Sequence, residues 1–82
     1  MKNELTQTKR IRALILEWFN QFNEGDQFTT DDVVKYVNRY LPKKGDAGNI
    51  KREMRFLRAW NQINYKIVGQ YKEKVIRVIK VI

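Results

Sequence analysis

The sequence predicts a small α+β domain in which three amphipathic helices precede a two-stranded β-hairpin. Three observations lead to this fold class. Apolar residues recur with helical spacing in three segments, turn-forming residues separate those segments, and two stretches rich in β-branched residues follow them. Because the 82 residues contain no internal repeat and no low-complexity linker, we expect one domain over residues 1–82.

The first helix is predicted from about Asn3 to Phe22. Its apolar residues return every three or four positions, as in a helix that buries one face. They are Ile11, Leu14, Ile15, Trp18, Phe19 and Phe22. Turn-forming residues 23–26 end the helix, and Gly25 among them readily adopts a positive φ.

The second helix is predicted to begin after Thr29, which is well placed as its N-cap. Asp32, three residues further on, completes an acidic variant of the capping box. Phe28 and Val33 have the spacing of a hydrophobic staple. The helix is expected to run up to Pro42, because proline disfavours helical backbone at the residue before it.

The third helix is predicted from residue 46 or 47 to residue 60, with Ile50, Met54 and Leu57 as its buried seam. Two strands follow at 63–68 and 75–82, joined by the polar loop 69–74 into a hairpin. An extended piece at 27–29 is placed to add a third strand.

Several aromatic residues also lie on or beside the apolar stripes and are predicted to belong to the core: Trp18, Tyr40, Trp60 and Tyr65. Phe56 falls on the flank of the third helix and is expected to pack beneath the loop 69–74.

The composition argues against several classes of function. The chain has no Cys, His or Ser, and so lacks thiolates, the usual zinc ligands and the commonest acid–base side chain at neutral pH. Asp31 and Asp32 resemble a carboxylate pair, but their place at a helix N-terminus explains them. We therefore expect no enzyme and neither a metal nor a cofactor.

The net positive charge of the chain arises entirely from its second half. Residues 1–42 carry six basic and six acidic side chains, whereas residues 43–82 carry eleven basic and three acidic ones, which gives the whole net charge of +8. This asymmetry indicates a surface that faces a polyanion. The alternative is a basic surface that serves only solubility.

The succession of helix, short strand, helix, turn, helix and hairpin resembles the winged helix-turn-helix family over roughly residues 8–82. The segment 50–63 resembles the end of that family's recognition helix. There Leu57 is followed four residues later by Asn61, where glycine is usual, and then by the apolar strand residue Ile63.

Within the family, Phe28 to Ile67 is most similar to the C-terminal winged-helix domain of DpnI-type methyl-directed restriction endonucleases. The catalytic domain of those enzymes has no counterpart in this sequence. We therefore do not carry over the sensing of base modification.

The resemblance implies a sequence-specific transcriptional regulator that binds double-stranded DNA, with residues 47–60 in the major groove and the wing 69–74 on the backbone. The residues expected to contact bases are Asn49, Lys51, Arg52 and Arg55. Those expected to contact the backbone are Lys43, Lys44, Gly48, Arg58, Lys72 and Lys74, and Tyr71 is a candidate for stacking on a sugar or base.

No basic-then-apolar leader and no apolar run of membrane length is visible, so the expected location is the cytoplasm, on the nucleoid when DNA is bound.

Other functions stay open: a protein-interaction module on the same scaffold, a non-specific nucleic-acid-coating protein, or RNA or single-strand binding. A second apolar line of Leu5, Leu16 and Phe19, or the apolar C-terminal strand, predicts a homodimer. The alternative is that this surface is covered within the monomer.

Overall fold

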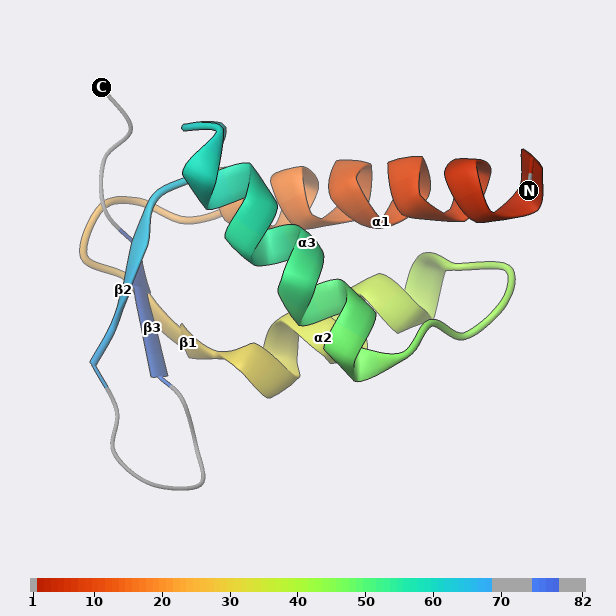
Figure 1. The fold of residues 1–82 in the computed structure, drawn as a ribbon. Helices are drawn as coiled ribbons and strands as arrows, with labels where there is room; N and C mark the ends of the chain where they lie inside the picture. Colours follow the sequence, from red (N-terminus) through yellow and green to blue (C-terminus); the bar gives the residue numbers. More distant parts are fainter. Residues whose placement is uncertain (1, 69–74, 79–82) are drawn as a thin grey trace.

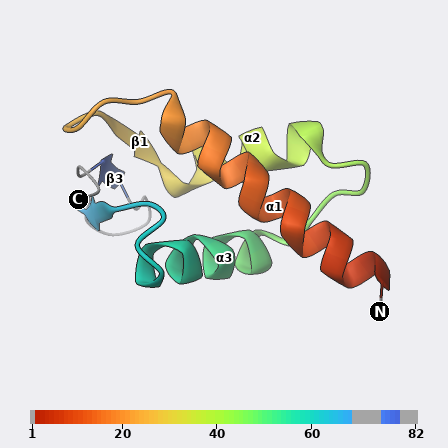
Figure 2. The same cartoon turned by 90° about the horizontal axis from the view of Figure 1, so that it is seen from above.

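The computed structural model describes residues 2–68 and 75–78, which form three helices and three short strands. In chain order these are α1 (Lys2–Asn20), β1 (Gln27–Thr29), α2 (Thr30–Tyr40), α3 (Ala47–Ala59), β2 (Tyr65–Ile67) and β3 (Val75–Val78). Each helix packs on the other two. The strands lie at the end of the molecule opposite the N-terminus (Figure 1), and α2 and α3 lie on either side of α1 when seen from above (Figure 2).

The turn after α1 is fixed to the last strand. Gly25 has a φ of 93°, the positive value that its sequence context predicted. Its amide N donates to the carbonyl O of Val78 at 2.9 Å, and the amide N of Val78 donates to the carbonyl O of Asp26 at 2.9 Å. These two hydrogen bonds place the start of β1 beside β3.

The start of α2 confirms the predicted capping box. The hydroxyl of Thr29 accepts a hydrogen bond from the backbone N of Asp32 at 3.1 Å, and the Asp32 carboxylate accepts one from the backbone N of Thr29 at 3.0 Å. Two backbone donors at the helix end are thereby satisfied. The helix ends at Tyr40, and Leu41 before Pro42 is extended with φ −80° and ψ 136°.

The end of α3 confirms the prediction for Asn61, which has a φ of 62°. The backbone N of Gln62 donates to the carbonyl O of Leu57, and that of Asn61 to the carbonyl O of Arg58. This pair of hydrogen bonds is the Schellman arrangement, in which a left-handed residue stops the helix and satisfies its last carbonyls.

The strands form a short antiparallel sheet in the order β1-β3-β2. Ile76 at the centre pairs with Phe28 on one side and Ile67 on the other. The strand β2 covers only residues 65–67 of the predicted 63–68, and β3 covers residues 75–78, while residues 79–82 of the second predicted strand lie outside the described residues. The loop 69–74 lies outside them as well.

The core lies between the three helices and the inner face of the sheet. Its fully buried side chains are Ile15, Val33, Val37, Ile50, Met54 and Ile76. The predicted stripe of α1 and seam of α3 both contribute to it, because their apolar residues lie on the faces that meet. Trp18 is half-buried against this core, and Tyr65 is 4% exposed.

Two aromatic residues predicted to be core are instead exposed. Tyr40 is 56% exposed, and its ring lies beside that of Tyr36 with the centroids 5.0 Å apart. Trp60 is 52% exposed. Its ring stacks on Phe56 and lies under the guanidinium of Arg12 instead of entering the core.

The apolar line proposed as a dimer surface on α1 is wrong in part. Phe19 is 7% exposed and belongs to the core, and Leu16 is half-buried against it. The ring of Phe19 packs on Phe28 of β1 and Tyr65 of β2, with centroid distances of 5.3 and 5.8 Å. The side chain of Leu5 lies outside the described residues.

Candidate nucleic-acid interface

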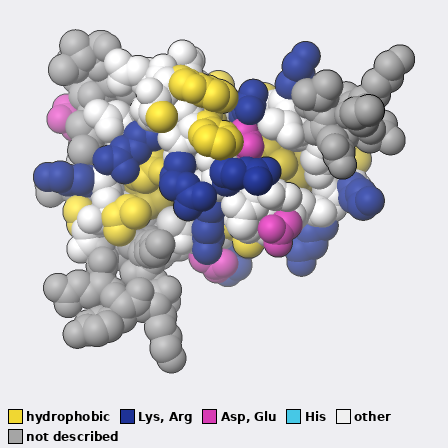
Figure 3. Space-filling model, in the orientation of Figure 1, with side chains coloured by type: hydrophobic (Ala, Val, Ile, Leu, Met, Phe, Trp, Pro, Cys, Tyr) yellow, Lys and Arg dark blue, Asp and Glu magenta, His cyan; other side chains and the backbone are white. Residues whose placement is uncertain are grey.

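The outer surface of α3 carries the residues predicted to contact bases. Because Ile50, Met54 and Leu57 point into the core, the positions between them face solvent, with the exception of the buried Glu53. The four predicted side chains are all exposed there: Asn49, Lys51, Arg52 and Arg55. Figure 3, in which α3 faces the reader, shows Lys and Arg side chains gathered across the middle of this surface.

The predicted backbone contacts lie partly beside this surface. Lys43 and Lys44 are exposed in the segment between α2 and α3, and Gly48 is exposed in the first turn of α3. Lys72, Lys74 and Tyr71 lie outside the described residues. The described part of the chain therefore brings together the turn and the helix of the predicted interface.

Arg58 differs from the other cations of α3, because it packs on an aromatic ring. Its guanidinium carbon lies 4.9 Å from the centroid of the Tyr65 ring. Burial raises the pKa of the Tyr65 hydroxyl, and the charge of Arg58 opposes that shift. Arg58 thus joins the end of α3 to β2, although its side chain is exposed.

Glu53 is the buried carboxylate of α3, and sequence reasoning missed its role. Its Oε1 lies 2.6 Å from Nε of Arg12 on α1, and its Oε2 lies 3.8 Å from Nε of Arg52. The Glu53 side chain is 5% exposed, whereas that of Arg52 is 53% exposed. The carboxylate consequently neutralises a cation of α1 and leaves the outer surface of α3 basic.

An exposed aromatic pair lies next to the basic surface. Phe56, 40% exposed, stacks on Trp60 with centroids 5.7 Å apart and planes 18° apart. The guanidinium carbon of Arg12 lies 4.9 Å from the centre of the Trp60 ring. Phe56 was expected to pack beneath the loop 69–74, and its contact with Trp60 was not predicted, because helical periodicity does not show which flank a neighbouring helix leaves open.

The described residues offer no group of three or more acidic side chains that would hold a metal ion. Within the same residues, the helices lack the length and apolar character that crossing a membrane requires. Comparisons with models of protein families, with curated proteins and with solved structures found no match to this chain.

Proposed function

We propose that this chain is a winged helix-turn-helix protein that binds double-stranded DNA as a sequence-specific transcriptional regulator, with α3 in the major groove. The observation that carries the proposal is the charge of the α3 surface. Lys51, Arg52 and Arg55 are exposed, whereas Glu53 is buried and paired with Arg12. The outer side of the helix thus presents Lys51, Arg52 and Arg55, while the carboxylate of Glu53 is buried and shared between Arg12 and Arg52.

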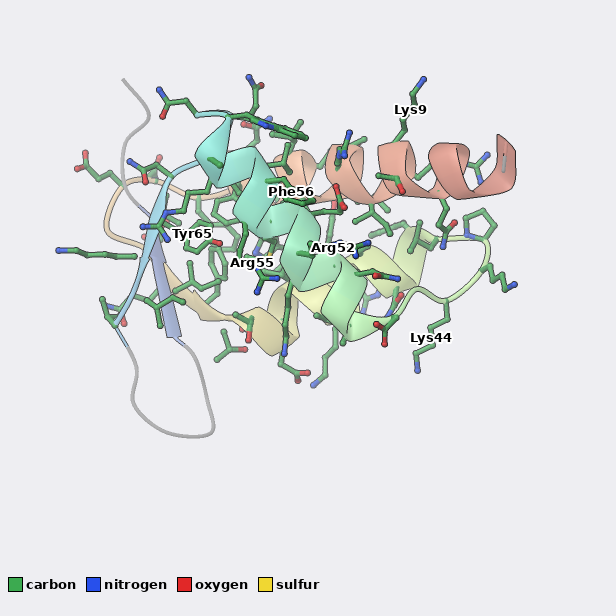
Figure 4. The ribbon with its side chains drawn as sticks, viewed as in Figure 1. Lys9, Lys44, Arg52, Arg55, Phe56 and Tyr65 are labelled. Atoms are coloured by element: carbon green, nitrogen blue, oxygen red, sulfur yellow. The ribbon has the colours of Figure 1, made fainter. Side chains whose placement is uncertain are left out.

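The geometry of α3 suits this role. The helix packs on α1 and α2 by one apolar seam, so its opposite side is free to enter a groove wide enough for an α-helix. Arg52 and Arg55, three residues apart, lie on neighbouring turns of that side (Figure 4). Arginine forms paired hydrogen bonds with guanine O6 and N7, the commonest specific contact in the major groove.

The remaining elements support the same reading. The order of helices and strands and the β1-β3-β2 sheet agree with a winged helix, and the loop 69–74 would be its wing. Lys43 and Lys44 stand at the start of α3, where phosphates would flank the groove.

A homodimer would present two copies of α3 about one DNA turn apart, and sedimentation over a concentration series tests for it.

The test is a competition titration of a selected duplex against a random duplex over a salt series. If five to seven cations of residues 43–82 meet phosphates, the log–log slope is expected to be roughly −4 to −6 per protomer. Preference for one sequence supports a regulator, and equal affinity for both identifies a non-specific DNA-coating protein. A flat salt response contradicts DNA binding.

The exposed aromatic pair favours a second candidate, a protein-interaction module. Large aromatic residues are enriched at the centres of protein interfaces, and Phe56 and Trp60 form such a pair beside α1. A module of this kind has no reason to bind duplex DNA with a steep salt dependence. The same titration therefore separates the two candidates.

A further inference from the structure

A cleft of about 750 Å³ opens beside the start of α3. One wall is the first half of α1, another is the segment 42–46, and the third is the first two turns of α3. Two hydrogen bonds hold the segment in place: Nε2 of Gln7 donates to the carbonyl O of Lys43 at 2.9 Å, and the backbone N of Gly45 donates to Oδ1 of Asn38 at 2.8 Å.

Cations from all three walls line this cleft. They are Arg10 of α1, Lys43 and Lys44 of the segment, and Arg52 of α3, and all four are exposed. No residue in the first half of α1 was predicted to take part in binding, because residues 1–42 carry equal numbers of basic and acidic side chains. The fold nevertheless places one of these basic side chains, Arg10, at the cleft.

Two carboxylates also line the cleft, and their surroundings differ. Glu53 is buried and its oxygens already face Arg12 and Arg52. Asp46 is exposed and is the N-cap of α3, yet its side chain makes no capping hydrogen bond. The cleft is therefore lined by four cations and two carboxylates, and the carboxylate of Glu53 already faces Arg12 and Arg52.

We infer that this cleft binds a phosphate group. Arginine and lysine side chains from three separate elements line it, with the amides of Gln7 and Asn49 beside them, and these donors match an oxygen-rich anion. On the proposed function, the phosphate belongs to the DNA strand that flanks the groove. Asn49 and Arg52 line both the cleft and the outer side of α3, so the same strand reaches both.

The experiment compares Arg10→Gln with Lys9→Gln. Both variants remove one exposed cation from adjacent positions of α1, but Lys9 does not line the cleft and points away from α3 (Figure 4). Each is titrated with a random duplex over a salt series. Each is also titrated with inorganic pyrophosphate without DNA, while the amide signals of Gly45 and Asn49 are followed by NMR.

The expected result is that Arg10→Gln weakens duplex binding about five- to tenfold and lowers the salt slope by about one, while Lys9→Gln stays within about twofold of the unchanged chain. If Arg10→Gln abolishes the pyrophosphate shifts but leaves duplex affinity unchanged, the phosphate belongs to a small molecule and the DNA source is overturned. If neither ligand distinguishes the two variants, the phosphate site is overturned.

A second variant acts in the opposite direction. Asp46→Asn removes the exposed carboxylate of the cleft, and asparagine is as good an N-cap as aspartate, so folding is expected to be unchanged. Pyrophosphate and duplex are both expected to bind about two- to fivefold more tightly. Weaker binding would contradict the site. Should the chain bind no DNA at all, the proposed function fails, and the pyrophosphate titration still decides the cleft.

Discussion

Nε of Arg12 on α1 lies 2.6 Å from Oε1 of Glu53 on α3, and this ion pair joins residues that are 41 positions apart. The Glu53 side chain is 5% exposed and that of Arg12 is 35% exposed. The same guanidinium also lies over the Trp60 ring. The pair joins α3 to α1 beside the apolar seam of α3.

Arg12→Met is predicted to lower the free energy of unfolding by about 2 kcal/mol, because it leaves a buried carboxylate without its close partner. The cost stays below that of a fully buried pair, since Arg12 is partly exposed and Arg52 remains 3.8 Å from the carboxylate. Urea denaturation measures it. Adding Glu53→Met should recover part of the loss, because the unpaired charge is then gone.

Lys35→Met is the matched control. It breaks the ion pair between Lys35 and Asp31, whose side chains are 76% and 71% exposed. Such pairs contribute little, and the unfolding free energy is expected to change by less than about 0.5 kcal/mol. Equal losses for Arg12→Met and Lys35→Met would mean that the burial of Glu53 has no energetic consequence.

Thr29→Ala is predicted to lower the free energy of unfolding by about 1 kcal/mol, because the backbone N of Asp32 loses its acceptor. Thr29→Ser keeps the hydroxyl and should recover most of it. Affinity for duplex DNA, measured with fully folded protein, should be unchanged in both variants. A loss of affinity at constant thermal stability would make Thr29 a contact residue.

Local signals in the sequence predicted the helix caps of this fold, but they did not predict contacts between residues that are distant in the sequence. Thr29 with Asp32 and the left-handed Asn61 follow from side chains within a few residues of each other, so the pattern is sufficient. The pairing of Glu53 with Arg12 depends on how two helices cross, which periodicity does not give. For the same reason Trp60 was assigned to the core.

The candidate site divides in the same way. The exposed cations of α3 follow from the helical period alone, because they lie opposite the apolar seam. The cleft does not follow from the helical period, because Arg10 and the segment 42–46 are distant in the sequence and come together only in the folded chain. Sequence reasoning therefore found the residues of one helix and missed the contribution of another.

The raised pKa of Tyr65 predicts that the folded state loses stability in alkali. Burial raises the pKa of its hydroxyl above the ordinary value of 10.0, so the folded state holds the proton more firmly than the unfolded state does. The resulting stability is complete below the unfolded pKa and is lost as the pH rises through the folded pKa. The urea midpoint should therefore fall above about pH 10.

Two variants separate this effect from other alkaline changes. Tyr65→Phe should reduce the alkaline fall of the urea midpoint, since it removes the ionising group. Arg58→Met should raise the pKa of Tyr65 further, because the cation over the ring is lost, and absorbance of tyrosinate follows the titration. Identical alkaline profiles for the original chain and Tyr65→Phe would rule out Tyr65 as the source.

Arg52 and Arg55 are predicted to read sequence, whereas Lys44 is predicted to position the protein. Arg55 and Lys44 are exposed, so alanine at either should leave the urea midpoint unchanged, whereas Arg52→Ala also removes the cation 3.8 Å from Glu53 and should lower the midpoint slightly. Arg52→Ala and Arg55→Ala should each cost about 1–3 kcal/mol on the preferred duplex and much less on random DNA, because a base contact matters only where the base is present.

Lys44→Ala should instead weaken both duplexes alike and reduce the salt slope by about one, because a phosphate is present on every sequence. Lys35→Ala on α2 controls for the loss of one positive charge. The contrast between the arginines and Lys44 is the decisive quantity. If the arginine variants lower both affinities equally, α3 acts as a phosphate clamp, and the protein coats DNA without reading it. If Lys44→Ala changes sequence preference, the segment before α3 reads the bases and the two roles are exchanged.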